Sequence, residues 1–207
     1  MRLLFFVLLT LSLECSSAFG AEREATAGEV LLEAKRLYYD GIDGNKQSLE
    51  KSTQMFANLA SSEPDNPEVK AYRGSIMLLQ AGRTWAVWKK YELSKAGLAS
   101  LDEAVRLAPS NLEVRFVRAA TTMHLPSFFS REQQSKDDLT FIAKQASVAV
   151  NNHELDSRLA AAALVFYAER AADPQERKAA LEEAFRLAPE SPAGKSAMRD
   201  LQKMQSK

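Results

Sequence analysis

The stretch Leu101–Asn111 reads Leu-Asp-Glu-Ala-Val-Arg-Leu-Ala-Pro-Ser-Asn, and it decides the fold because it returns later in the chain. Eighty residues on, Leu181–Ser191 reads Leu-Glu-Glu-Ala-Phe-Arg-Leu-Ala-Pro-Glu-Ser, identical at seven of eleven positions. A looser copy, Thr53–Asn66, ends in Ala-Ser-Ser-Glu-Pro-Asp-Asn. Recurrence of one element predicts a repeat architecture, in which stacked units build an extended binding surface.

Each copy predicts the end of one helix, a turn and the start of another. The apolar positions of the first stretch recur at helical spacing: Leu101, Ala104, Val105 and Ala108. Pro109 ends the helix, because the residue before a proline is pushed out of the α region. Ser110, followed three residues later by Glu113, has the spacing of a capping box for the next helix.

These copies resemble the tetratricopeptide repeat of exported bacterial proteins, whose unit is a pair of antiparallel helices, A and B. The family's B helix carries a small, a large apolar and a second small residue, and then a proline, matched here by Gly97, Leu101, Ala104 and Pro109. Arg73-Gly74 supplies the glycine that the family prefers in the A helix. The resemblance covers roughly 27–203 and implies an α-solenoid of about four antiparallel hairpins with a C-terminal capping helix.

The other copies match this pattern with departures. Ser52, Phe56 and Pro64 fill the positions of the first copy, with Leu59 at the second small position. Leu181, Ala184 and Pro189 fill those of the last copy, where Arg177 replaces the first small residue. The fold class predicted from the resemblance is therefore all-α.

Helix signals along the chain divide it into nine predicted helices. Asn66 before Pro67 and Asp173 before Pro174 are helix starts, and Ser130 with Gln133 resembles a further capping box. We expect helices over Ala25–Asp40, Lys46–Ser61, Pro67–Ala81, Thr84–Ala108, Asn111–Met123, Glu132–Val150, His153–Ala172, Pro174–Ala188 and Pro192–Gln205.

Met1–Gly20 has the three parts of a secretory signal peptide. Arg2 supplies a positive start, Leu3–Leu13 is an almost unbroken apolar run, and Ala18-Phe19-Gly20 offers small residues for cleavage. The run is shorter than the roughly 20 residues that span a bilayer. A buried helix is the disfavoured alternative, because the run has no polar face. We expect a signal peptide over 1–20, one repeat domain over 21–207, and a periplasmic or secreted location.

The charge balance points away from nucleic acid and anionic membranes. The chain carries 27 Lys and Arg against 27 Asp and Glu, which leaves no overall electrostatic footprint. We expect a protein partner and no stable membrane insertion after signal cleavage. Cys15 is the single cysteine, and Glu14 precedes it where a lipoprotein signal needs a small residue, so neither lipid attachment nor a disulfide is expected.

No motif in the sequence predicts catalysis, a metal or a cofactor. His124 and His153 have no second histidine or cysteine at ligand spacing, and glycine-rich phosphate loops are missing from the sequence. Asp137 and Asp138 are adjacent on a predicted helix, so their side chains point about 100° apart and cannot share a site. We therefore expect a protein that is not an enzyme.

Two aromatic segments leave an alternative open. Pro64 and Pro109 are 45 residues apart, against about 34 for the usual unit, and the excess lies around Trp85–Tyr91. An exposed ligand ledge is possible there, but aromatic residues at helical spacing favour core packing. Phe128-Phe129 is interpreted as a plug for the adjoining gap or as a binding insertion. If both segments enclosed a cavity, the protein would bind an apolar small molecule or lipid.

The resemblance implies that A helices line the concave face of the array. By register, the groove-facing set is Ser75, Leu78, Leu79, Phe116, Ala120, Met123 and His124. Because the set is mostly apolar and has no Lys or Arg, it suits an apolar peptide-like segment. We therefore expect a non-catalytic protein-interaction scaffold of the bacterial cell envelope, with Phe116 and Met123 as anchors. In the alternative, these side chains are buried between helices and no groove exists.

Overall fold

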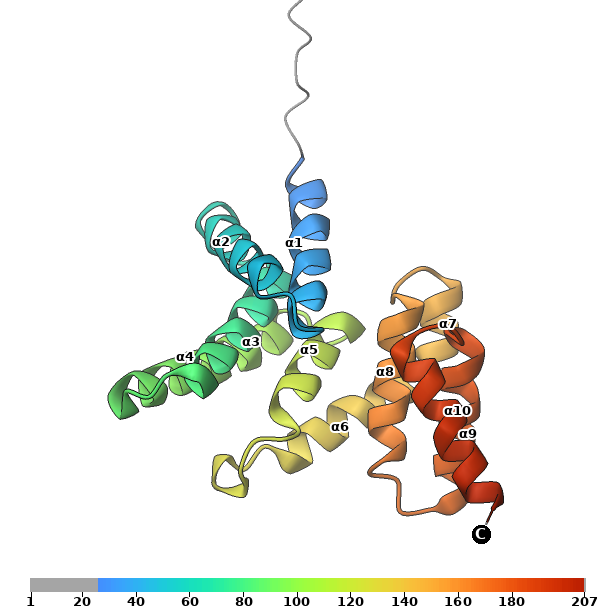
Figure 1. Cartoon of the computed structure of the whole chain (residues 1–207). Helices are drawn as coiled ribbons and strands as arrows, with labels where there is room; N and C mark the ends of the chain where they lie inside the picture. The colour runs from blue at the N-terminus through green and yellow to red at the C-terminus, as the bar shows by residue number, and fades with distance from the viewer. Residues whose placement is uncertain (1–25, 207) are drawn as a thin grey trace, which may run out of the picture.

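Within residues 26–206, which the computed structural model describes, the chain forms ten α-helices and one short 3-10 turn (Figure 1). The signal peptide predicted for Met1–Gly20 lies outside the described residues. The all-α prediction is confirmed, and no described helix is long and apolar enough to cross a membrane. The elements are α1 (Ala27–Ile42), α2 (Lys46–Ser62), α3 (Pro67–Arg83), α4 (Val87–Leu107), α5 (Leu112–Thr122), η1 (Ser127–Phe129), α6 (Glu132–Ala143), α7 (Ala146–Asn151), α8 (Ser157–Ala168), α9 (Pro174–Leu187) and α10 (Pro192–Gln205).

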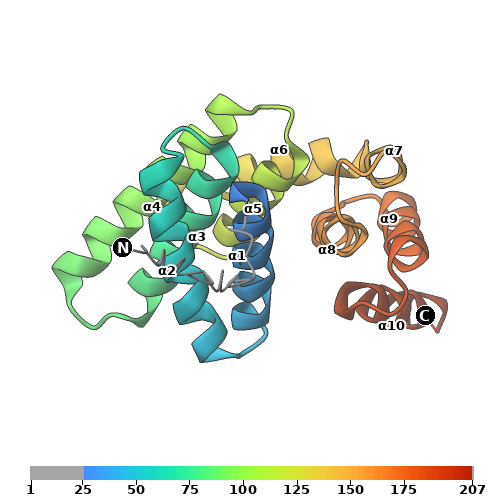
Figure 2. The same ribbon diagram turned by 90° about the horizontal axis from the view of Figure 1, so that it is seen from above.

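Consecutive helices pack in antiparallel pairs. Helix α1 packs on α2, α3 on α4, α5 on α6 and α8 on α9, which is consistent with a helical-repeat arrangement. Helix α10 packs on α9 and α8 at the end of the chain, where a capping helix was expected. Helix α6 runs from α5 to α8 and joins the two halves of the molecule (Figure 2).

Small residues allow the closest helix contacts. A Cβ placed on Gly74 would lie 2.7 Å from the carbonyl oxygen of Gly97, and one placed on Gly97 would lie 2.8 Å from that of Gly74. A side chain at either position would therefore force α3 and α4 apart. At the matching level of the first pair, the Ser52 hydroxyl donates to the Ala34 carbonyl at 2.9 Å.

Two clusters of buried apolar side chains form the interior. The N-terminal core is built from α1 to α5, with Phe56, Tyr72 and Leu101 among its members. The C-terminal core is built from α5 to α10, with Leu139, Ile142 and Leu181 among its members. Burial of Leu101 and Leu181 confirms the apolar stripe read from the repeated stretch.

Helix α5 contributes to both cores from opposite faces. Val114 and Val117 belong to the N-terminal core, whereas Phe116 and Ala119 belong to the C-terminal core. The halves of the molecule therefore share one helix of 11 residues.

Several helix ends differ from the sequence prediction. The helix expected over Glu132–Val150 is interrupted between α6 and α7, and the next helix starts later, at Ser157. Asn66 and Asp173 cap α3 and α9 as predicted.

Two predicted capping boxes are wrong. Asn111 rather than Ser110 caps α5, because its side-chain oxygen accepts from Val114 N–H. Ser130 adopts a φ of 54° after η1 and does not cap α6. A residue in this left-handed region ends a turn and cannot place its side chain over the next helix start.

Candidate functional site

Four of the seven residues predicted to line the groove are buried in the structure: Ser75, Leu78, Phe116 and Met123. Leu79 and Ala120 are half-buried, and His124 is exposed. Phe116 and Met123, the expected anchors, are therefore both buried, and Phe116 packs in the C-terminal core, as the alternative reading of this set anticipates. The binding role of the seven residues stays a prediction, and three of them reach the surface.

The inner face of α1, α3 and α5 is filled by its own side chains. The Ser75 hydroxyl bonds Tyr38 at 2.6 Å and accepts a hydrogen bond from Thr121 at 2.8 Å. Phe116 stacks on Phe166 of α8, with ring centroids 6.3 Å apart. These contacts engage Ser75 and Phe116 within the protein itself.

A cluster of tyrosines and charged groups lies next to this face. The Tyr72 hydroxyl donates to Glu113 Oε1 at 2.7 Å and bonds the Tyr39 hydroxyl at 2.8 Å. Burial raises the pKa of both tyrosines well above the usual value. Burial opposes the charge on Lys35, but Glu113 and Glu68 outweigh it, so the pKa of Lys35 is raised.

The half-buried Leu79 faces a cleft between α2 and α3, which we call the α2–α3 cleft. The cleft has a volume of about 200 Å³ and is lined by Leu49, Glu50, Thr53, Ile76, Leu79, Gln80 and Arg83. Its apolar side chains come from both helices, and polar groups surround them. Within the described residues, the side chains of Glu50, Gln80 and Arg83 make no hydrogen bond or ion pair, so they are available to a ligand.

A second hollow lies between α8, α9 and α10, with a volume of about 340 Å³. Its charged groups are engaged within the chain. Lys203 pairs with Asp200 at 2.6 Å, and Arg177 donates to the carbonyls of Ala168 and Ala171. The second hollow therefore offers fewer free polar groups than the α2–α3 cleft.

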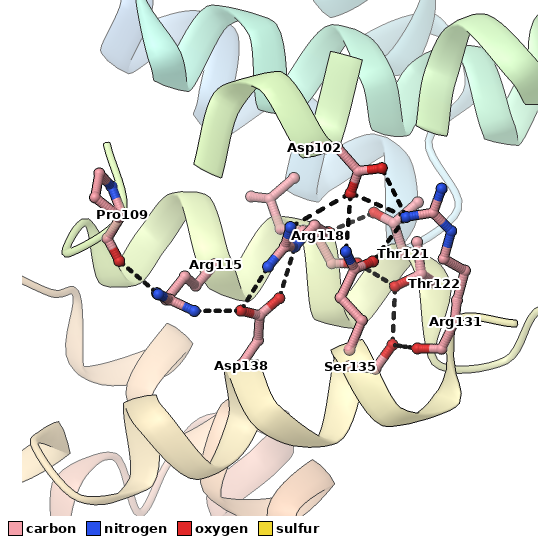
Figure 3. Close-up of polar contacts among 11 residues, drawn as sticks. Asp102, Pro109, Arg115, Arg118, Thr121, Thr122, Arg131, Ser135 and Asp138 are labelled. Carbon is pink, nitrogen blue, oxygen red and sulfur yellow. Dashed lines mark hydrogen bonds and ion pairs between the residues drawn. The ribbon is translucent and has the colours of Figure 1, made fainter. Parts of the chain in front are cut away.

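A buried network, which we call the polar seam, joins α4, α5 and α6 (Figure 3). Asp138 of α6 has no exposed surface. Its two oxygens accept from Arg118 Nε at 2.7 Å and Arg118 Nη2 at 2.9 Å, and Arg115 Nη1 adds a contact at 2.6 Å. Asp102 of α4 extends the network, because it pairs with Arg118 at 3.3 Å and with Arg131 at 2.7 Å.

The polar seam has a structural role, because it holds α4, α5 and α6 together. Among the described residues, no buried side-chain nitrogen or oxygen lacks a hydrogen-bond partner. A carboxylate that is shielded from solvent and held by two guanidinium groups has no access to a substrate. Asp137 is exposed and accepts from Gln133 at 2.8 Å, so the two adjacent carboxylates do point apart, as predicted.

Sequence reasoning missed the seam, although one signal was present. Arg118 stands in a buried stripe between Val114 and Thr122, and Asp138 stands beside the buried Leu139. When one helix carries a cation in its apolar stripe and the next helix carries an anion in its own, the two charges are expected to form a buried pair.

The core prediction for the first aromatic segment is wrong. Trp85 exposes 88% of its surface, Trp88 68% and Tyr91 67%, and Val87 is exposed as well. Helix α4 has 21 residues and starts at Val87 rather than at Thr84 as expected, and the following α5 has only 11 residues. Without a matching extension in the next pair, no part of the chain between residues 26 and 206 covers these aromatic side chains.

The cavity suggested between the two aromatic segments stays a prediction, and the phenylalanines of the second segment differ in exposure. Phe128 exposes 77% of its surface, whereas Phe129 packs half-buried against the N-terminal core. The plug interpretation therefore fits Phe129 alone. Neither the α2–α3 cleft nor the second hollow is lined by a residue of either segment.

The two histidines lie in separate turns of the described chain. His124 contacts Phe166 edge-on with ring centroids 6.4 Å apart, and His153 is exposed in a turn at φ 61°. Within residues 26–206, no group of three or more His, Cys, Asp or Glu could hold a metal ion.

Comparison with protein-family models, with curated proteins and with solved structures found no match in any of the three.

Proposed function

We propose that this chain is a non-catalytic scaffold of the bacterial cell envelope, tetratricopeptide-like in build, that holds an apolar peptide-like segment of a partner protein. The observation that carries the proposal is the α2–α3 cleft, with an apolar floor and unengaged polar groups at its rim. The signal peptide expected over Met1–Gly20 supports a periplasmic or secreted location.

The tetratricopeptide-like build is supported by the pairing of helices and by the residues at their contacts. The glycines that match the family's small positions, Gly74 and Gly97, are the ones at which α3 and α4 touch. Ser52, the matching residue in the first copy, contacts the Ala34 backbone. Small residues at these points let the two helices of a unit approach closely.

The size of the cleft favours one side chain over a whole small molecule. Pockets for small molecules have about 300–1,000 Å³, whereas this one has about 200 Å³. Leu49, Ile76 and Leu79 would contact a large apolar side chain from a bound segment. Gln80 and Arg83 at the end of α3 would meet backbone or acidic groups that flank it.

Site-specific photo-crosslinking tests this proposal. A crosslinking residue at exposed position Gln80 should give a discrete adduct in the envelope fraction. Thr53→Trp fills the cleft, so the adduct yield should fall by at least about tenfold, the loss expected for an interface anchor. An equal yield from the Thr53→Trp variant would contradict the proposal.

Thr140→Trp is the matched control. Both threonines lie half-buried on a helix and donate to the carbonyl four residues earlier, Thr53 to Leu49 at 2.7 Å and Thr140 to Lys136 at 2.8 Å. The control changes the same residue type on α6, away from the cleft, and should leave the yield unchanged.

A further inference from the structure

The α3–α4 hairpin carries the largest exposed aromatic side chains of the described chain at its connecting end. This end projects at the lower left of Figure 1 and at the left edge of Figure 2. We call the exposed group Trp85, Val87, Trp88 and Tyr91 the aromatic tip. Trp85 and Trp88 contact each other edge-on, with ring centroids 6.4 Å apart. Exposed apolar groups gathered on a projection indicate a site of interaction.

The polar atoms of the aromatic tip are free. Within the described residues, neither tryptophan indole N–H nor the Tyr91 hydroxyl makes a hydrogen bond. Helix α4 begins here, after Ala86. Its first backbone N–H groups have no intrahelical partner, and no capping side chain accepts a hydrogen bond from them. The tip therefore combines apolar rings with unpaired donors at one exposed end of the hairpin.

Basic residues flank the aromatic tip in the sequence. Between residues 83 and 95 the chain has four cations, Arg83, Lys89, Lys90 and Lys95, and one acid, Glu92. None of the four cations forms an ion pair with a carboxylate in the part of the chain that the structure describes. The local charge is strongly positive although the whole chain is balanced at 27 charges of each sign.

We infer that the aromatic tip docks on the surface of an anionic lipid bilayer. Trp and Tyr favour the headgroup level, where their rings lie in the apolar boundary and their donors in the wet layer. Lysines beside them extend long apolar stems and place their ammonium groups against lipid phosphates. The uncapped backbone donors of α4 suit the same phosphate oxygens.

The geometry favours a bilayer over other occupants. None of the four tip residues lines the α2–α3 cleft or the second hollow, whereas apolar peptide segments bind in grooves. A second copy would bring two clusters of unpaired cations together, which costs electrostatic energy. The exposed start of α4, Val87–Tyr91, has a length of roughly 6 Å at 1.5 Å per residue, within the depth of about 5–10 Å reached by interfacial helices.

The intrinsic fluorescence of the two tryptophans reports on the aromatic tip directly. Trp85 and Trp88 are the only tryptophans in the sequence, so intrinsic fluorescence reads the tip alone. The protein, as the producing cell processes it, is mixed with vesicles of phosphatidylcholine and phosphatidylglycerol, and with vesicles of phosphatidylcholine alone. We expect a blue shift and quenching by brominated lipid with the anionic vesicles, weakened by salt.

Variants at the tip test which groups bind the bilayer, using vesicle flotation. Lys89→Gln with Lys90→Gln should weaken partitioning about twenty-five-fold, because each lysine near an anionic leaflet contributes roughly fivefold. Trp85→Ser with Trp88→Ser should abolish the salt-resistant part of binding. Circular dichroism melts check that these exposed changes leave the fold intact.

Matched controls lie elsewhere on the surface. Phe128→Ser removes another exposed aromatic ring, and Lys136→Gln with Lys144→Gln removes two exposed cations on or just after α6. Both should bind vesicles like the unmodified protein. The tip variants change residues that lie outside the α2–α3 cleft, so loss of peptide binding and loss of lipid binding are distinguishable.

Three results would overturn the inference. One is an unchanged tryptophan spectrum with anionic vesicles. Another is equal flotation of the tryptophan-to-serine variant and the unmodified protein. The third is a blue shift that depends on protein concentration without lipid, because it would assign the tip to a second copy of the chain.

Discussion

The polar seam and the aromatic tip each place a side chain against its ordinary preference. Asp138 is charged and has no exposed surface, whereas Trp85 is large and apolar and exposes 88% of its surface. Their partners differ: two arginines hold Asp138 with contacts of 2.6–2.9 Å, while Trp85 meets only the edge of Trp88 within its segment. The buried charge is fully paired, so it stabilises the fold. The exposed aromatic ring has no such partners, so it is available to other molecules.

Removal of the buried carboxylate should give the largest effect. Asp138→Ala leaves Arg115 and Arg118 without their shared partner, and breaking a buried pair in this way costs about 3–5 kcal/mol. Denaturant unfolding measures the loss in the free energy of unfolding. Asp137→Ala, at the exposed neighbour, should change it by less than about 0.5 kcal/mol. Equal losses for the two variants would remove the distinction between paired and unpaired positions.

Truncation of the repeated leucine should rank next. Leu101→Ala and Leu181→Ala each open a cavity in a core, so each should cost about 2–5 kcal/mol. Leu107→Ala, a partly exposed leucine on the same helix as Leu101, should cost less. If denaturant unfolding showed losses below about 0.5 kcal/mol for both core variants, the apolar stripe would have been assigned to the wrong face.

The buried tyrosines should make stability depend on alkaline pH. The folded chain holds the protons of Tyr39 and Tyr72 more tightly than the unfolded chain, because their pKa values are raised from 10.0. This stability is therefore complete below pH 10 and is lost as the pH rises above it, by up to about 1.4 kcal/mol per pH unit for each proton. Tyr39→Phe should reduce the slope in thermal melts between pH 9 and pH 11. An unchanged slope would show that Tyr39 does not contribute.

The aromatic tip should give the smallest effect on stability. Trp85→Ser with Trp88→Ser removes two large side chains but little buried surface, so the free energy of unfolding should change by less than about 0.5 kcal/mol. The same denaturant experiment measures it. If the free energy of unfolding fell by several kcal/mol, the rings would be packed in solution, and Trp85 would no longer differ from Asp138 in its contribution to stability.

The helices and their pairing could be predicted because their signals are local. The stripe that contains Leu101 and the caps Asn66 and Asp173 act within a few residues, so the sequence displays them directly. The break between α6 and α7 carries no proline or glycine, and it was therefore missed.

The candidate site could be predicted only in part, because it depends on which helix faces which. Leu79 reaches the α2–α3 cleft, but Phe116 is covered by Phe166 of α8, fifty residues away in the chain. The exposure of Trp88 follows from the shortness of α5, a property of the neighbouring unit. Helical spacing predicts which residues share a face of a helix. It does not predict which neighbouring element covers that face.

The position of α5 between the two cores has a consequence for cooperativity. With Val117 packed on one side and Phe116 on the other, α5 has little free surface of its own, and its backbone amides are shielded by both halves. Repeat arrays unfold unit by unit when each interface is weak. Here the loss of either half would expose an apolar face of α5, so the two halves are coupled. Amide hydrogen exchange in α5 should therefore require the opening of the whole molecule, while the ends of α1 and α10 exchange by local fraying.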